Sequence, residues 1–253
     1  FVDVAGFSTI SERLAAEGTQ GTERLTEELN AFFDPSIDLI HDCGGDVLAF
    51  GEDSMFVAFN GSTELADLQH CADGIHAIAS SHRSSSSEDI AIAVRIGVDV
   101  GEVVSTVAKA GARTVVLHGG DGIDRAVNAH RSVDPGATGW GSEPLIRPHH
   151  RHTLPSRPIP LTRRADLVHP VIARRIGNAS GFVAEHRRVT CAFVAIENAE
   201  WSTEMGVDRI AAVVDAALAV VTDLGGELVQ FTSGDKGSVI LALFGAPLAV
   251  ADP

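Results

Sequence analysis

Two stretches of the chain follow one pattern, and this internal repeat constrains the fold more than any other feature. The first stretch opens with FVDVAGFS (residues 1–8) and continues, about 40 residues later, with GGDVLAFGED (44–53). The second opens with FVAI (193–196) and continues with GGELVQF (225–231) and ALF (242–244). A repeat of this kind predicts two related domains within one polypeptide.

The two copies differ at a position that matters for chemistry. Asp3 in the first copy corresponds to Ala195 in the second, so only the first copy keeps a carboxylate at the end of its opening strand. We therefore expect a pseudo-twofold pair of domains within one chain, with a single working metal site.

Strand and helix patterns alternate along both copies. Apolar periodicity and turn residues predict strands, helices and hairpins. For the first copy these are a strand at 1–4, helices at 8–17 and 22–42, a hairpin at 46–59, a helix at 65–81, strands within 90–107 and at 115–118, and a helix at 121–133. For the second they are a strand at 187–196, a helix at 210–224 and a hairpin at 227–244. This order predicts an α+β fold of the ferredoxin-like βαββαβ kind, with a mainly antiparallel sheet covered by helices on one face.

A change in composition separates the copies. Seven of the ten prolines lie between Pro135 and Pro170, in a stretch that is also rich in Arg and His. We predict a first domain at 1–147, the end of that domain and a linker at 148–186, and a second domain at 187–253. Only nine residues follow Phe244, whereas about 90 follow the first hairpin, so we expect the second copy to be truncated.

Composition also limits the partners and the compartment. The net charge of −15 argues against binding to nucleic acid or to an anionic membrane surface. The longest apolar helical run, 210–221, is too short to span a bilayer and contains Asp215. Three widely spaced cysteines, Cys43, Cys71 and Cys191, suit a reducing cytosol better than a disulfide framework. We expect a cytoplasmic protein without nucleic-acid or membrane partners.

Asp3 and Asp53 are the candidate metal ligands. Asp3 ends a buried strand, Gly6 permits close backbone approach, and Ser8 is expected to cap a helix whose free N–H groups bind phosphate. Asp53 at a hairpin tip would complete a site for two Mg²⁺ ions, which bind carboxylates together with substrate phosphates. The plainer alternative is that Asp3 is a surface or capping residue and Asp53 an ordinary turn residue, and spacing alone favours that alternative.

Taken together, residues 1–8, 44–46 and 50–53 resemble the class III nucleotidyl cyclases. RRVT (187–190), GDKG (234–237) and FGAP (244–247) resemble the same family. The tandem layout is most similar to the soluble adenylyl cyclases, and the resemblance covers almost the whole chain except the linker. It implies conversion of ATP to 3′,5′-cyclic AMP and pyrophosphate in intracellular signalling, with the two domains paired within one chain.

The resemblance also implies roles for individual residues. Asp3 and Asp53 match the two catalytic metal aspartates, and the carbonyl of Val4 matches a further ligand of the Mg²⁺ ions, for which Mn²⁺ can substitute. The loop that holds the triphosphate corresponds to four consecutive residues, Ala5, Gly6, Phe7 and Ser8.

Lys236 matches the lysine that selects the purine in adenylyl cyclases. Its ammonium group donates a hydrogen bond, which suits the acceptor at adenine N1, whereas guanine N1 carries a hydrogen and needs an acceptor such as Glu. The alternative is an exposed hairpin lysine. The second hairpin is also four residues longer than the first, counted from Phe231 to Phe244 against Phe50 to Phe59.

Several positions depart from the family pattern. Glu52 stands where the family has Gly, and Ala49 stands where bicarbonate-responsive members carry Lys. Asp124 and Asn128 occupy the positions of the transition-state Asn and Arg, as expected for the non-catalytic half. In the second copy that helix would fall beyond Pro253, so we expect the fragment alone to be inactive or weakly active.

These departures leave alternatives open. One is a catalytically degenerate cyclase-like module that binds nucleotide or a regulatory partner without turnover, and another is a guanylyl cyclase. A metal site at His149, His150 and His152 is disfavoured because no Cys or acidic residue lies at ligand spacing.

Overall fold

The computed structural model describes residues 1–51, 53–60, 63–81, 92–110, 113–141, 189–234 and 237–246. These residues form two compact units. The first unit contains residues 1–101 and 125–141, and the second contains 102–124 and 189–246. The chain thus enters the second unit after Gly101 and returns to the first inside one helix, after Asp124. The predicted domain ends at 147 and 186 lie outside the described residues and stay predictions.

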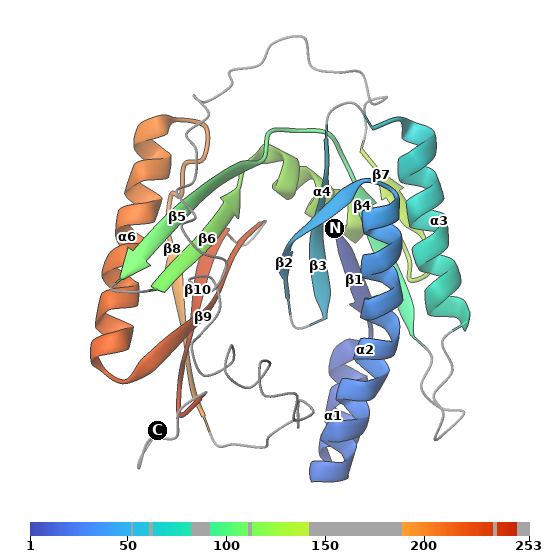
Figure 1. Cartoon of the computed structure of the whole chain (residues 1–253), viewed down its shortest axis with the longest axis horizontal. Helices are drawn as coiled ribbons and strands as arrows, with labels where there is room; N and C mark the ends of the chain where they lie inside the picture. Colours follow the sequence, from blue (N-terminus) through green and yellow to red (C-terminus); the bar gives the residue numbers. More distant parts are fainter. Residues whose placement is uncertain are drawn as a thin grey trace. The chain divides into compact units, whose positions relative to one another are not determined.

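The first unit is built on a five-stranded sheet (Figure 1). Its elements are β1 (Val2–Ala5), α1 (Phe7–Ala15), α2 (Thr19–Asp42), β2 (Gly45–Phe50), β3 (Ser54–Phe59), α3 (Leu65–Ser81), β4 (Ala93–Val98), β7 (Thr138–Trp140) and the C-terminal half of α4 (Asp121–Arg131). The strand order is β2-β3-β1-β4-β7, and all pairs are antiparallel except β4 with β7. The mixed α+β class predicted from the sequence is therefore confirmed.

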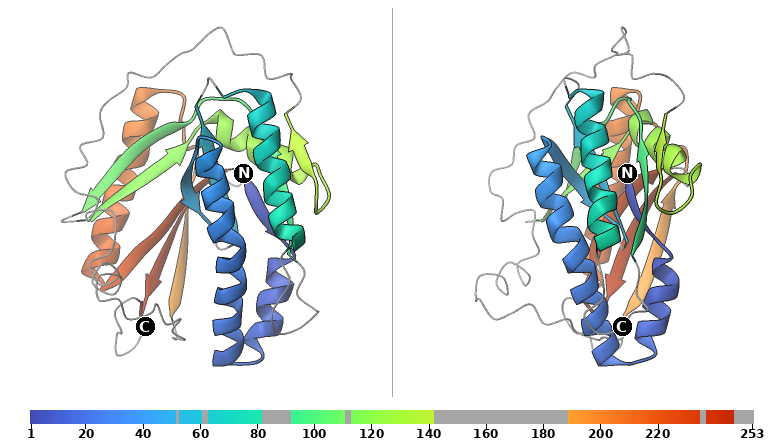
Figure 2. Two further views of the ribbon diagram at one scale, coloured as in Figure 1. Left: turned by 45° about the vertical axis from the view of Figure 1, so that its right-hand side comes forward. Right: turned by 90° about the vertical axis from the view of Figure 1, so that its right-hand side faces the viewer.

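Alternation along the strands separates the two faces of this sheet. Val2 and Val4 of β1 and Ile96 of β4 are buried in one core with residues of α2 and α3, which lie side by side in Figures 1 and 2. Gly97 follows Ile96 and therefore points to the opposite face. A Cβ atom there would lie 2.0 Å from the carbonyl oxygen of Ala126, so α4 packs directly on that face. The prediction of helices on one face was wrong, because glycine in β4 lets a further helix approach the other.

The second unit contains a three-stranded antiparallel sheet, one long helix and a two-stranded ribbon. The sheet order is β8-β10-β9, and the elements are β8 (Thr190–Ile196), α6 (Glu204–Asp223), β9 (Gly226–Gly234), β10 (Gly237–Phe244), β5 (Val104–Ala110) and β6 (Arg113–Gly119). Ile210, Val214 and Leu218 of α6 are buried in one core with apolar residues of β5, β6, β9 and β10. The β5–β6 ribbon thus packs in the second unit, although in the sequence it follows β4.

The strand pairing in the two sheets identifies equivalent residues in the two units. In each unit one aromatic residue, one apolar partner and one valine are paired across three adjacent strands. These sets are Phe50–Met55–Val2 in the first unit and Phe231–Ile240–Val194 in the second. Four residues (51–54) separate Phe50 from Met55, whereas eight (232–239) separate Phe231 from Ile240. The second hairpin is therefore four residues longer, as the sequence predicted.

Element ends follow local capping. Helix α3 has the bounds predicted for it, whereas α6 begins at Glu204 rather than at residue 210. Its N-cap is Thr203, whose hydroxyl accepts a hydrogen bond from the backbone N–H of Gly206 at 3.1 Å. Within the described part of the chain, no helix has the length and hydropathy needed to cross a membrane.

Candidate functional site

The backbones of the two predicted metal acids lie beside each other in the first unit. The N–H group of Val4 donates a hydrogen bond to the carbonyl oxygen of Asp53 at 2.8 Å. Asp3 is opposite Ser54 in the register of β1 and β3. A hydrogen bond of 2.6 Å from the N–H of Gly51 to the carbonyl of Ser54 closes the turn that carries Asp53. The sheet therefore brings together two acids that are 50 positions apart in the sequence.

The loop after β1 leads directly into a helix without a capping side chain. Gly6 is the N-cap of α1 and has the left-handed φ of 78°, which glycine adopts without strain. The N–H groups of Thr9 and Ile10 bond to its carbonyl at 3.1 and 3.2 Å. Since no side chain caps this terminus, the N–H groups of the first turn are suited to an anion such as phosphate.

The expectation that Ser8 caps this helix was wrong. Helix α1 begins at Phe7, so Ser8 lies inside the first turn, and its carbonyl accepts a hydrogen bond from the Ser11 hydroxyl at 3.0 Å. The left-handed turn at Gly6 starts the helix earlier than the pattern of polar residues indicated. The predicted phosphate loop nevertheless runs through this turn, because Ala5 ends β1 and Gly6 joins it to Phe7.

The Asp3 carboxylate lies between two basic side chains on the sheet face that α4 covers. Its Oδ2 atom is 3.7 Å from Arg95 Nη1 of β4 and 3.7 Å from His130 Nε2 of α4. Burial raises the pKa of Asp3 above its usual value, and the charges of His130 and then Arg95 oppose that rise. The net upward direction means that burial outweighs both cations.

The oxygen donors at this site fit a hard divalent cation. At 3.7 Å neither basic group is within hydrogen-bond distance of Asp3, so these contacts leave its lone pairs for a ligand. Among the described residues, no group of three or more His, Cys, Asp and Glu side chains could hold a metal. Asp3 and Asp53 would therefore hold Mg²⁺ only together with other oxygens, and Mg²⁺ commonly completes its shell with waters and substrate phosphates.

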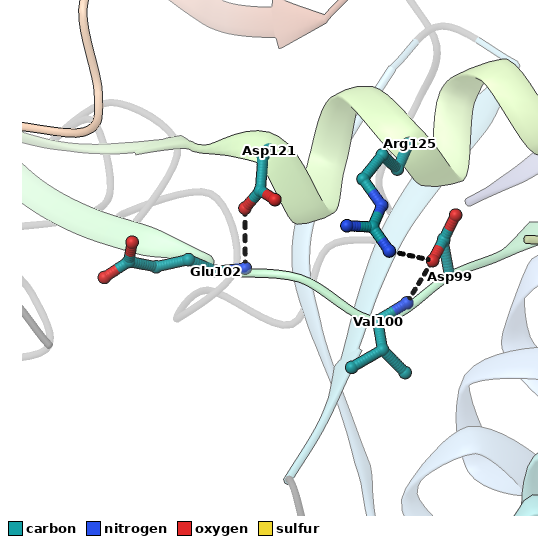
Figure 3. A network of polar contacts seen from close by, with 5 residues as sticks. All are labelled: Asp99, Val100, Glu102, Asp121 and Arg125. Atoms are coloured by element: carbon teal, nitrogen blue, oxygen red, sulfur yellow. Dashed lines mark hydrogen bonds and ion pairs between the residues drawn. The ribbon is translucent and has the colours of Figure 1, made fainter. Parts of the chain in front are cut away.

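Polar contacts also organise the segments around the start of α4 (Figure 3). In the first unit, Asp99 Oδ1 accepts hydrogen bonds from the N–H of Val100 at 2.6 Å and from Arg125 Nη2 at 2.9 Å. In the second unit, Asp121 Oδ1 accepts a hydrogen bond from the N–H of Glu102 at 2.8 Å. Asp121 stands in the first turn of α4, where a negative charge is favourable.

The end of β8, which corresponds to the Asp3 end of β1, forms a pocket instead. A cavity of about 460 Å³ is lined in the second unit by Ala195, Glu197, Trp201, Ser238 and other residues, including Asp124. The Trp201 indole N–H donates to the Ser238 hydroxyl at 3.4 Å, and that hydroxyl is 3.2 Å from Ser233 Oγ. Ala195, the counterpart of Asp3, thus lines a polar cavity.

The sequence patterns did not reveal the two basic partners of Asp3. Arg95 could have been found from strand alternation, because it lies between the apolar residues Val94 and Ile96 and so shares the face of Asp3 once β1 and β4 are paired. His130 carried no such indication, since its position depends on the packing of α4 against Gly97. Glu52, Lys236 and the histidines at 149, 150 and 152 lie outside the described residues, so their predicted roles stay predictions.

Comparison with known proteins gives similarity only to solved structures. No protein-family model and no curated protein sequence matches the chain. The guanylyl cyclase Cya2 is 21% identical, with 54% of this chain and 70% of that chain covered at a TM-score of 0.45. The dimeric guanylyl cyclase domain of the RhoGC fusion protein from the aquatic fungus Blastocladiella emersonii is 17% identical, with 55% and 75% covered at a TM-score of 0.44. At these values the similarities assign neither a family nor an activity to this chain.

Proposed function

We propose that the chain is a tandem nucleotide cyclase that converts ATP to 3′,5′-cyclic AMP and pyrophosphate. The observation that carries this proposal is the meeting of the Asp3 and Asp53 segments beside the uncapped start of α1. Two acids and a helix N-terminus at one strand end supply ligands for divalent metal and for phosphate together.

The proposal includes the architecture. We propose that both units derive from one cyclase-like βαββαβ domain. The order β2-β3-β1-β4 in the first unit and the matching register of β1 with β8 support this view. The two units would pair within the chain, with the first supplying the metal acids.

In the proposed reaction the ribose 3′-oxygen attacks the α-phosphorus, the bond to the bridging oxygen breaks, and pyrophosphate leaves. Asp3, Asp53 and the carbonyl of Val4 would hold Mg²⁺, which lowers the pKa of the 3′-hydroxyl and offsets the phosphate charge when bound. The backbone of residues 5–8 would bind the triphosphate. Lys236 would donate a hydrogen bond to adenine N1. Catalysis of this kind depends mostly on positioning and electrostatics.

A second candidate is a cyclase-like module that binds nucleotide without turnover. Arg95 and His130 favour it, because they already face the charge of Asp3. A guanylyl cyclase is the third candidate. It differs from an adenylyl cyclase in the residue that contacts purine N1, because adenine N1 needs a hydrogen-bond donor and guanine N1 needs an acceptor.

The test is metal-dependent nucleotide binding, followed by product analysis. Binding of Mg·ATP and Mg·GTP is measured by calorimetry, and the cyclic nucleotides formed on long incubation are measured by mass spectrometry. The cyclase proposal predicts metal-dependent ATP binding and cyclic AMP, both lost in Asp3→Asn. Nucleotide binding that Asp3→Asn leaves unchanged would instead support the non-catalytic module, and absence of nucleotide binding with or without Mg²⁺ would refute both.

The melting temperature of Asp3→Asn provides the control that separates loss of binding from loss of folding. Because burial raises the pKa of Asp3, its contribution to stability is fully present below the unfolded value of 3.8 and is lost as pH rises through the folded value. At neutral pH the ionised carboxylate therefore disfavours folding. Asp3→Asn should keep or slightly raise the melting temperature while it removes binding, and a large fall in that temperature would indicate a structural role.

A further inference from the structure

Two of the three cysteines meet in the core of the first unit. Cys43 is the C-cap of α2, and Cys71 lies in the first half of α3, 28 residues later (71 minus 43). Cys71 is 3% exposed, and the half-buried Cys43 packs against the same hydrophobic core. The Cys43 thiol is close enough to Cys71 to raise the pKa of the Cys71 thiol through its charge and a hydrogen bond. The third cysteine, Cys191, is exposed in the second unit.

A close helix contact brings these thiols together. A Cβ atom on Gly74 of α3 would lie 2.5 Å from Leu39 Cδ2 of α2, so the helices approach at a point where α3 has no side chain. Leu39 stands four residues before Cys43, and Gly74 stands three residues after Cys71. One turn from this contact, the two cysteines therefore face each other across the helix pair. Two cysteines that interact across a close helix contact are candidates for a disulfide.

We infer that Cys43 and Cys71 form a dithiol site that a peroxide converts into a reversible disulfide linking α2 to α3. In the first step the Cys43 thiolate attacks hydrogen peroxide, which gives a sulfenic acid at Cys43 and hydroxide. In the second step the Cys71 sulfur attacks Cys43 Sγ, the S–O bond breaks, and the thiol proton of Cys71 leaves with the hydroxyl group as water. Peroxide is thereby reduced and the two thiols are oxidised by two electrons.

The surroundings of the two thiols set the order of these steps. Burial, the neighbouring Cys43 charge and the hydrogen bond to Cys43 together raise the pKa of Cys71 to about 12. Cys71 is therefore almost entirely protonated at neutral pH and inaccessible, whereas Cys43 at the helix end is open to a small oxidant. Cys43 is the peroxide-reactive group and Cys71 the resolving group.

The disulfide would be attached to a segment that forms part of the proposed active site, although the inference does not depend on the proposed function. Cys43 is followed by Gly44, with a φ of 78°, and then by β2, whose hairpin carries Asp53. A disulfide at Cys43 would tie the start of this hairpin to α3.

The experiment treats the whole chain with hydrogen peroxide and counts free thiols. The site predicts a fall from three thiols to one, a linked Cys43–Cys71 peptide pair in proteolytic digests, and full reversal by dithiothreitol. Cys191→Ser is the matched control and should fall from two thiols to none with the same linked pair. Cys43→Ser should retain the Cys71 thiol.

Trapping with dimedone in a second variant tests for the sulfenic acid intermediate at Cys43. In Cys71→Ala, dimedone should label Cys43 as a sulfenic acid, whereas the wild-type chain should show little label because Cys71 resolves it. Over-oxidation of Cys43 to sulfinic acid with Cys71 still reduced would overturn the inference. A cross-link that runs only through Cys191 would overturn it as well.

Discussion

β1 and β8 hold the same place in the register of their hairpins, but their surroundings differ. β1 is hydrogen-bonded to β3 on one side and to β4 on the other, whereas β8 pairs only with β10 among the described strands. Val2 of β1 is 3% exposed, while its counterpart Val194 is 47% exposed and the adjacent Phe193 is 69% exposed. A similar strand sequence is thus central in one unit and peripheral in the other.

This difference shows how sheet position sets the chemistry of a side chain. A strand with neighbours on both sides places Asp3 between Arg95 and His130, and there burial raises the pKa of its carboxyl group. The corresponding residue of β8, Ala195, lines a polar cavity instead. The proposed metal ligand, Asp3, lies in the first environment, where the surrounding strands and α4 hold it in place.

The largest expected effect comes from removing the proposed metal acids of the first unit. Asp53→Asn should reduce metal-dependent nucleotide binding and any cyclisation by about 10²–10³-fold, because a carboxylate that holds the cation is lost. Asp46→Asn is the matched control, since this exposed acid lies in the same hairpin away from the turn. Calorimetric titration with Mg·ATP measures the effect. If Asp46→Asn and Asp53→Asn weakened binding equally, the hairpin turn would have no special role.

The next effect concerns the longer hairpin of the second unit. Lys236→Glu should shift the preference for ATP over GTP by about 10–100-fold, since an unpaired buried polar group costs about 1–3 kcal/mol. Lys109→Glu, at the exposed position of the other lysine, should leave the preference unchanged. The ratio of the two binding constants is the measurement. Equal losses for ATP and GTP in Lys236→Glu would show that this residue does not contact the base.

Matched truncations test the contrast between the two strands directly. Val2→Ala should lower the free energy of unfolding by about 2 kcal/mol through lost burial and a residual cavity. Val194→Ala should cost less than about 0.5 kcal/mol, because half of that side chain is already in solvent. Urea unfolding of the two variants gives the comparison. Equal losses would mean that β8 is buried in solution as fully as β1.

Local patterns predicted the elements well. The helix at Leu65–Ser81 was predicted residue for residue, because its apolar positions are regularly spaced. The longer second hairpin was also predicted, since the repeat allows counting between equivalent aromatic residues, and the register confirms it.

Long-range packing was harder to predict. Strand patterns at residues 104–119 gave no indication that the β5–β6 ribbon would pack with α6 in the second unit. That choice depends on which apolar surfaces meet in space. The early start of α1 was missed for another reason, since the positive φ of Gly6 is a local conformation that a polar-residue pattern does not reveal.

The smallest expected effect lies in α3 and β7, for which the described part of the second unit has no counterparts. His76 Nε2 is 2.9 Å from the Thr138 hydroxyl, and burial lowers the pKa of His76 below 6.5, although Asp73 opposes this shift. The unfolded chain therefore binds more protons, so the contribution of His76 to stability is present above pH 6.5 and is lost as pH falls through the lower folded pKa.

Between pH 8 and pH 5 the melting temperature of the wild type should fall about 1–3 °C more than that of His76→Gln, whose amide can keep the bond to Thr138. His70→Gln, an exposed change on the same helix, should follow the wild type. Parallel curves for the wild type and His76→Gln would show that His76 titrates alike in the folded and unfolded chain.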